Sequence, residues 1–136
     1  MKEMVFVDTD IIYDVLANRE PFYSSAAKLL SLADEGRITI TVSALSFVNI
    51  HYLISKQLTS EKAKQVLRTF RVLIQIAPID EKIIDLALNS DFKDFEDAIQ
   101  YYCALESECQ VLLTRNLKDF KTAKIPVMTA KDYINF

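Results

Sequence analysis

The sequence predicts an α/β fold, in which helices cover both faces of a mostly parallel sheet of about five strands. Short β-rich runs alternate with amphipathic stretches along the whole chain. Parallel strands need crossover connections of a dozen or more residues, which are usually helices. The 136 residues are 51% hydrophobic with a single Gly, a composition that excludes a disordered chain and fits one domain over residues 1–136.

Two strands and two helices are expected in the first 42 residues. Met4–Val7 is a short apolar run, typical of a buried strand, and residues 10–18 suit a short helix. Pro21 suits the first turn of the next helix, and Gly36 suits its C-terminus, where positive φ is needed. One face of that helix is apolar at helical spacing, through Ala26, Leu29, Leu30 and Ala33. The β-branched run Ile38–Val42 predicts the second strand.

The middle of the chain is expected to hold two helices and the third strand. Ser43 is expected to cap a helix that runs to about Lys56. A second helix begins at Ser60 and has one apolar face, formed by Ala63, Val66, Leu67 and Phe70. The third strand, Val72–Ala77, is stopped by Pro78.

The C-terminal part repeats the alternation of helices and strands. Helices are expected over residues 80–90 and 95–108, and Val111–Leu113 is the fourth strand. Pro126–Met128 is a short fifth strand, followed by a final helical turn or two at Ala130–Ile134.

Three aspartates stand where a parallel sheet binds its ligands, which is beyond the carboxyl ends of the strands. Asp8 follows the first strand, Asp97 lies at the start of the helix that leads to the fourth, and Asp119 lies in the loop after the fourth. We expect them to converge, and three close carboxylates require a proton or a hard cation such as Mg²⁺ or Mn²⁺. Such a cluster is suited to phosphodiester hydrolysis. Each also has a structural alternative, as a helix cap, a partner of the helix dipole and a solvated turn residue, respectively.

Neutral and basic side chains near the same rim are further candidates. Asn49 offers a neutral oxygen ligand, or simply faces solvent. Thr114 and Asn116 are expected to bind the loop backbone and orient Asp119, or to be ordinary turn residues. Arg115 and Lys118 are candidates for phosphate contacts, with a solvated charged loop as the alternative. Lys93, Lys121 and Lys124 share these two interpretations.

The net charge and the cysteines exclude several classes of protein. Sixteen basic and nineteen acidic residues give a net charge of −3, so bulk positive charge does not hold this chain on nucleic acid. Cys103 and Cys109 form no disulfide framework and are expected to be ordinary reduced thiols. No apolar run approaches the roughly 18 residues that a spanning helix needs, and residues 1–10 are not expected to belong to a signal peptide. The expectation is a cytoplasmic protein with no membrane partner.

Three segments resemble the PIN domain (PilT N-terminus) family across nearly the whole chain. They are Val5–Ile11 (VFVDTDI), Asp94–Ala98 (DFEDA) and Leu113–Phe120 (LTRNLKDF), and they resemble the subgroup with "DFEDA" and "TRNxKDF" motifs. The resemblance implies a three-layer α/β/α sandwich that cleaves RNA with Mg²⁺ or Mn²⁺. It also implies a bacterial toxin held inactive by a small antitoxin, often as a dimer.

The resemblance assigns residues by position. Asp8, Asp97 and Asp119 match the family's metal-binding acids, and many PIN nucleases carry a Glu where this chain has Asn49. Glu96 is a candidate for the missing carboxylate, although neighbouring residues project about 100° apart on a helix. Asn116 matches the polar position that precedes the last acid.

Two other functions remain open from the sequence. A phosphohydrolase resembling the haloacid-dehalogenase group would use Asp8 as nucleophile, Asp10 as acid/base and Ser43 for phosphate. A PIN-like domain that binds RNA or protein without cleaving is favoured by Asn49 and by the net charge of −3.

Overall fold

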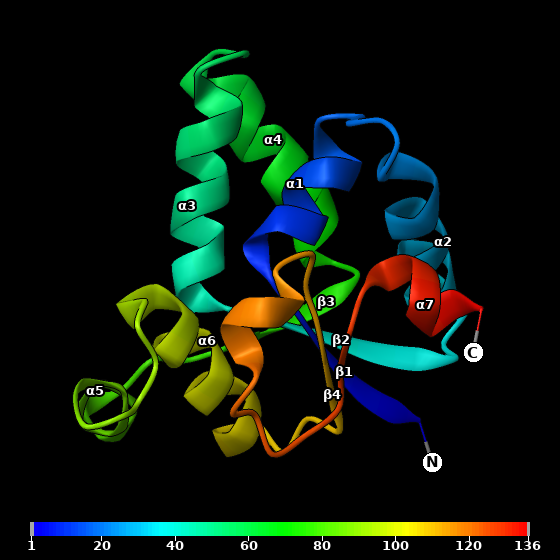
Figure 1. Cartoon of the computed structure of the whole chain (residues 1–136). Helices are drawn as coiled ribbons and strands as arrows, with labels where there is room; N and C mark the ends of the chain where they lie inside the picture. Colours follow the sequence, from blue (N-terminus) through cyan, green and yellow to red (C-terminus); the bar gives the residue numbers. More distant parts are fainter. Residues whose placement is uncertain (1, 136) are drawn as a thin grey trace.

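The five strands form one parallel sheet, seen in a computed structural model that describes residues 2–135 (Figure 1). The strand order is β3-β2-β1-β4-β5, and all four pairings are parallel. The strands are β1 (Glu3–Val7), β2 (Ile38–Ser43), β3 (Ile74–Ala77), β4 (Val111–Leu113) and β5 (Val127–Met128). The predicted sheet is therefore confirmed, with β1 at its centre.

Helices cover both faces of this sheet and give the three-layer α/β/α arrangement. They are α1 (Thr9–Leu16), α2 (Tyr23–Asp34), α3 (Ala44–Ser55), α4 (Ser60–Arg71), α5 (Glu81–Leu88), α6 (Phe95–Glu106) and α7 (Ala130–Ile134). Buried residues of α1 to α4 and α7 form one core, and those of α5 and α6 form the other. Figure 1 shows α5 and α6 on the side of the sheet opposite α1 and α2.

The central strand β1 fixes the position of the residue that follows it. Val5 and Val7 point into the first core and Phe6 into the second, because side chains alternate along a strand, and all three are fully buried. The backbone N–H of Asp8 still donates to the Leu113 carbonyl at 2.9 Å. The backbone of Asp8 is therefore held in place at the end of a buried, hydrogen-bonded strand.

Side chains at the starts of six helices accept hydrogen bonds from free backbone N–H groups, and three of these caps bear on the site. Asp8 caps α1, Ser43 caps α3 as predicted, and Asp94 caps α6 by accepting from the N–H of Asp97 at 3.0 Å. Asp8 directly follows β1 and Ser43 is the last residue of β2, so α1 and α3 both begin at the carboxyl edge of the sheet.

Several predicted boundaries differ from the observed ones by one or two residues, and those of the third strand and of α2 are two examples. The third strand begins at Ile74 rather than Val72, because α4 continues into a turn in which the Leu73 N–H donates to the Phe70 carbonyl at 3.0 Å. Pro21 is not in the first turn of α2, which begins at Tyr23.

None of the helices within residues 2–135 combines the length and apolarity that a membrane span requires. Cys103 and Cys109 are both buried and free. Burial raises the pKa of Cys103 to about 12 and that of Cys109 to about 11, so neither thiol ionises near neutral pH.

Candidate functional site

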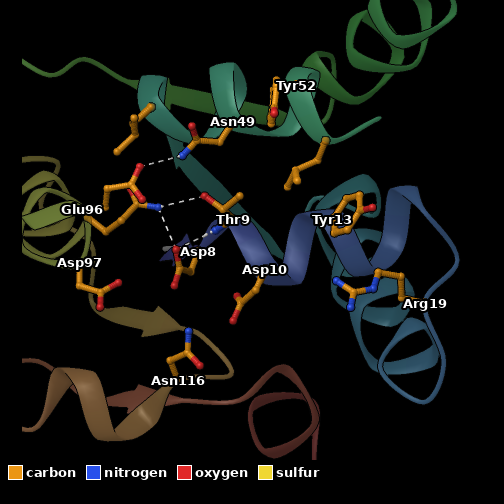
Figure 2. Close-up of a pocket in the computed structure, with 13 residues that line it drawn as sticks. Asp8, Thr9, Asp10, Tyr13, Arg19, Asn49, Tyr52, Glu96, Asp97 and Asn116 are labelled. Atoms are coloured by element: carbon orange, nitrogen blue, oxygen red, sulfur yellow. Dashed lines mark hydrogen bonds between the residues drawn. The ribbon is translucent and has the colours of Figure 1, made fainter. Parts of the chain in front are cut away.

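A pocket of about 470 Å³ opens at the carboxyl edge of the sheet, where α1, α3, α6 and the loop after β4 meet (Figure 2). The residues that line it are Asp8, Thr9, Asp10, Tyr13, Arg19, Leu45, Asn49, Tyr52, Leu53, Glu96, Asp97, Gln100 and Asn116. Four of them are carboxylates from two distant parts of the chain. The predicted convergence at this rim is therefore found for Asp8 and Asp97.

The Asp8 carboxylate is held in place by three donors. Its Oδ1 accepts from the Thr9 N–H at 2.8 Å and from Gln100 Nε2 at 2.9 Å, and its Oδ2 accepts from Thr114 Oγ1 at 2.9 Å. Asp8 is only 6% exposed. A buried carboxylate needs such partners, and the set fixes both oxygens at the floor of the pocket.

Gln100 links α6 to the starts of α1 and α3. Its Nε2 also donates to Ser46 Oγ at 2.8 Å, and Ser46 shares a 2.7 Å hydrogen bond with Thr9 Oγ1. Gln100 Oε1 is buried and has no hydrogen-bond partner within residues 2–135. Sequence reasoning missed Gln100, although it lies three residues after Asp97 and thus on the same helix face.

Asp10 is held by the loop after β4. Its Oδ2 accepts from the Arg115 N–H at 3.0 Å and its Oδ1 from the Ile11 N–H at 2.7 Å. Burial, and then the charge of Asp8, raise the pKa of Asp10 to about 6.

Asp97 lies in the field of four other carboxylates. Burial raises its pKa to about 7, with further contributions from Asp94, Asp8, Asp119 and Glu96, in that order. A carboxylic acid with a pKa near neutrality, in a cleft of like charges, is typical of a functional site.

Glu96 and Asn49 meet on the α3 side of the pocket. Asn49 Nδ2 donates to Glu96 Oε1 at 3.3 Å, and Figure 2 shows Glu96 directed toward α3 while Asp97 lies nearer Asn116. Both Glu96 and Asp97 line the pocket in spite of their angular separation on α6. Asn49 on α3 thus has a carboxylate beside it.

The loop after β4 places its residues in different surroundings. Thr114 is fully buried and Asn116 lines the pocket. Lys118 and Asp119 belong to a 3₁₀ turn, Leu117–Phe120, and line a neighbouring hollow of about 350 Å³ that shares Asp97 with the pocket. Asp119 is therefore beside the site rather than in the lining of the pocket.

Arg115 lies outside the pocket. Its Nε and Nη2 donate to the two Asp14 oxygens at 2.9 and 3.2 Å, and its guanidinium lies 4.0 Å from the centroid of the Phe22 ring. Asp14 is 1% exposed, so the pair is largely withdrawn from solvent. Asp14 was not among the residues singled out in the sequence.

The donor set has the chemistry that a hard divalent cation prefers, since carboxylate and amide oxygens are its usual ligands. Within residues 2–135, no three His, Cys, Asp or Glu side chains are arranged to enclose one ion. Mg²⁺ usually retains several waters and takes one or two carboxylates. The pocket therefore fits a hydrated cation, whose charge would offset the repulsion at Asp97 and Asp10.

A divalent cation is expected to stabilise the protein at pH 8 and much less at pH 5. The folded pKa values of Asp97 and Asp10, about 7 and about 6, exceed the ordinary 3.8 of an unfolded chain. Their stabilising contribution is complete below pH 3.8 and is lost as pH rises through 6 to 7. At ten times its Kd, a cation should add about 1.4 kcal/mol, or roughly 4 °C in Tm. Calorimetry with MgCl₂ against NaCl of equal ionic strength measures this, and equal shifts at both pH values would contradict it.

Comparison with known proteins gives a family and several relatives. The sequence matches the family described as "PIN domain" over residues 4–118. Ribonuclease VapC1 of Aquifex aeolicus (strain VF5) is 24% identical, in an alignment that covers 96% of this chain and 93% of that protein.

Two solved structures illustrate the likeness in fold. VapBC2 from Rickettsia felis, bound to a DNA fragment from their promoter, gives a TM-score of 0.68 at 19% identity, over 92% of this chain and 96% of that one. A toxin-antitoxin complex from Klebsiella pneumoniae gives 0.69 at 25% identity, over 93% and 97%. Because the family match covers most of the sequence, including β1, α3, α6 and β4, this chain belongs to the PIN domain family.

Proposed function

We propose that this chain is a metal-dependent endoribonuclease that hydrolyses RNA phosphodiester bonds in the cytoplasm, as the toxin of a toxin–antitoxin pair. Residues 1–136 then form a single PIN domain. The proposal rests on the pocket at the carboxyl edge of the sheet in this PIN-family chain. Four carboxylates line this pocket, those of Asp8, Asp10, Glu96 and Asp97, and the pKa of Asp97 is raised to about 7.

Asp8, Asp97 and Asp119 are the proposed ligands of Mg²⁺ or Mn²⁺. Such an ion, when bound, lowers the pKa of a water molecule and neutralises charge on the phosphate. Gln100 and Thr114 keep both Asp8 oxygens in one orientation. The charge of Asp119, felt at Asp97, supports its place beside these two.

Glu96 is the proposed replacement for the Glu that many PIN nucleases carry where this chain has Asn49. The 3.3 Å hydrogen bond from Asn49 to Glu96 supports this, because it directs the Glu96 carboxylate toward the α3 side of the pocket. The site then keeps four carboxylates in its lining. Assignment to the subgroup with "DFEDA" and "TRNxKDF" motifs is part of the same proposal.

The proposed substrate contacts come from the loop after β4. Asn116 lines the pocket and Lys118 lines the adjoining hollow, so both are placed to meet an RNA backbone. Thr114 is fully buried and acts by positioning Asp8. The guanidinium of Arg115 is engaged by Asp14, so we propose that Arg115 anchors the loop.

A protein antitoxin is the proposed partner, by analogy with relatives solved as VapBC and toxin-antitoxin complexes. The homodimer that the family resemblance implies stays a prediction. Membership in the PIN family favours the nuclease over the haloacid-dehalogenase-like phosphohydrolase. We expect no phosphorylated Asp8 during turnover, and such an intermediate would identify the phosphohydrolase.

Incubation with RNA, with Mn²⁺ or with a chelator, tests the proposal. We expect cleavage only with the metal, and Glu96→Gln should lower its rate about 10-fold, the usual effect of disturbing a metal's supporting ligands. Glu61→Gln is the matched control, because Glu61 holds the corresponding first-turn position of α4 and is absent from the pocket lining. If the wild-type protein binds RNA but neither binds metal nor cleaves RNA, the nuclease proposal is wrong and the chain is an RNA-binding domain.

A further inference from the structure

The pocket has a second end that none of the proposed roles uses. Tyr13, Arg19, Tyr52 and Leu53 line it together with the carboxylates. Figure 2 shows Tyr13 and Arg19 on the side of the pocket away from Glu96 and Asp97, with Tyr52 on the α3 wall. One pocket thus joins an acidic end to an aromatic end that carries a positive charge.

Arg19 is the single cation among the lining residues that the structure describes. Its side chain is 44% exposed, and its guanidinium lies 4.9 Å from the centroid of the Tyr13 ring. Its Nη1 is 3.7 Å from Asp14, whose oxygens already accept two shorter hydrogen bonds from Arg115. Within residues 2–135 the Arg19 guanidinium donates no hydrogen bond, so its N–H groups can serve a ligand.

The loop that carries Arg19 is ordered by its own backbone. The Arg19 N–H donates to the Asp14 carbonyl at 2.9 Å, and the Arg19 carbonyl accepts from the N–H groups of Phe22 and Tyr23 at 3.0 and 2.8 Å. Asn18 takes a positive φ of 53°, a conformation that asparagine tolerates. Arg19 is therefore presented from a defined turn.

Two aromatic rings, those of Tyr13 and Tyr52, line the same pocket as this cation. Gln57 Nε2 donates to the Tyr13 hydroxyl at 2.9 Å, which fixes the Tyr13 ring. Tyr52 is 62% exposed, an unusual amount for a large aromatic side chain, and Lys56 Nζ lies 4.4 Å from its ring centroid. An exposed ring with cations nearby is the arrangement that proteins use to stack unpaired bases and contact the adjoining phosphate.

We propose that Tyr13, Arg19 and Tyr52 form a nucleotide subsite for single-stranded RNA, in which Arg19 binds the phosphate next to the scissile one and Tyr52 stacks the base. The inference rests on the proposed nuclease function and deepens it. A net charge of −3 makes a local cation necessary for any polyanion. Duplex RNA is excluded from the stacking contact, because its bases are already paired and stacked.

The subsite is tested by measuring how tightly a fluorescent single-stranded RNA of about ten nucleotides, roughly the span of one such site, binds to residues 1–136 with Asp97→Asn. This variant is used because cleavage then does not interfere with the binding measurement. We expect Arg19→Gln and Tyr52→Ala each to weaken binding about 10-fold. Arg19→Lys and Tyr52→Phe should stay within about 3-fold, because they keep the charge and the ring. Arg19→Gln should also lower the salt dependence by about one counterion. Arg37→Gln, at the opposite edge of the sheet before β2, is the matched control.

Oligonucleotide binding that is the same for Arg19→Gln, Tyr52→Ala and Arg37→Gln would overturn the subsite, and would leave this end of the pocket to a protein partner. Binding of duplex RNA that depends equally on Tyr52 would also contradict it. A failure of the proposed nuclease function would give a different result. The wild type would then show no Mn²⁺-dependent cleavage, while RNA binding would still depend on Arg19 and Tyr52.

Discussion

Replacing Asp97 with asparagine is expected to lower the rate of Mn²⁺-dependent RNA cleavage by about 10²–10³-fold, because a bound metal supplies several kcal/mol of charge stabilisation. The same change should leave the metal-free protein at least as stable as the wild type at pH 8. Burial and four neighbouring carboxylates raise the pKa of Asp97 to about 7, so its charge opposes folding at that pH. The neutral amide removes the repulsion and retains the shape.

Cleavage rate and Tm, measured on the same preparation, check this pair of effects. Asp85→Asn is the matched control, since Asp85 is exposed on α5 and away from the pocket. It should change neither quantity appreciably. An Asp97→Asn protein that cleaves normally would remove Asp97 from the proposed metal ligands, whereas a loss of stability would show that Asp97 has a structural role.

Replacing Arg115 with methionine is expected to lower the free energy of unfolding by about 2–3 kcal/mol, because the Asp14 carboxylate would be left buried without its main partner. Asp14 is 1% exposed and receives two hydrogen bonds from Arg115 at 2.9 and 3.2 Å. Arg19 Nη1, 3.7 Å away, would compensate only in part.

A double-mutant cycle by chemical denaturation isolates this interaction. Asp14→Leu together with Arg115→Met should be more stable than Arg115→Met alone, since no charge is left unpaired. Burial already raises the pKa of Asp14, and loss of Arg115 raises it further. The Arg115→Met defect should therefore be smallest at acidic pH, where Asp14 is protonated in the folded protein, and grow as pH rises through the raised folded pKa of Asp14. Strictly additive effects, or a defect that does not change with pH, would contradict this.

The sequence was sufficient for the fold because each layer has its own periodicity. The runs at Met4–Val7, Ile38–Val42 and Val111–Leu113 predicted the central strands, and the strand-end rule placed Asp8 and Asp97 at one rim. The predicted start of β3 was wrong because the apolar pattern of the strand extends back to Val72 and Leu73. In the structure, the backbone N–H groups of these two residues instead donate to carbonyl groups at the end of α4.

The polar contacts around the site could not be predicted in the same way. Asp14 and Arg115 are 101 residues apart, and a charged residue on a short helix is indistinguishable from a solvated one by local pattern. Gln100 was hidden for the same reason, since its partners Asp8 and Ser46 lie in other segments. Hydrogen bonds of this kind follow from tertiary packing rather than from spacing along the chain.

The three donors to Asp8 also determine when, during synthesis, the site comes into existence. Thr9 directly follows Asp8 in the chain, but Gln100 and Thr114 are made 92 and 106 residues after Asp8. The central strand β1 likewise lacks its β4 neighbour until Val111–Leu113 has left the ribosome. A growing chain that is still shorter than this has no assembled acidic pocket. The fold therefore delays the appearance of the site until translation has passed Thr114.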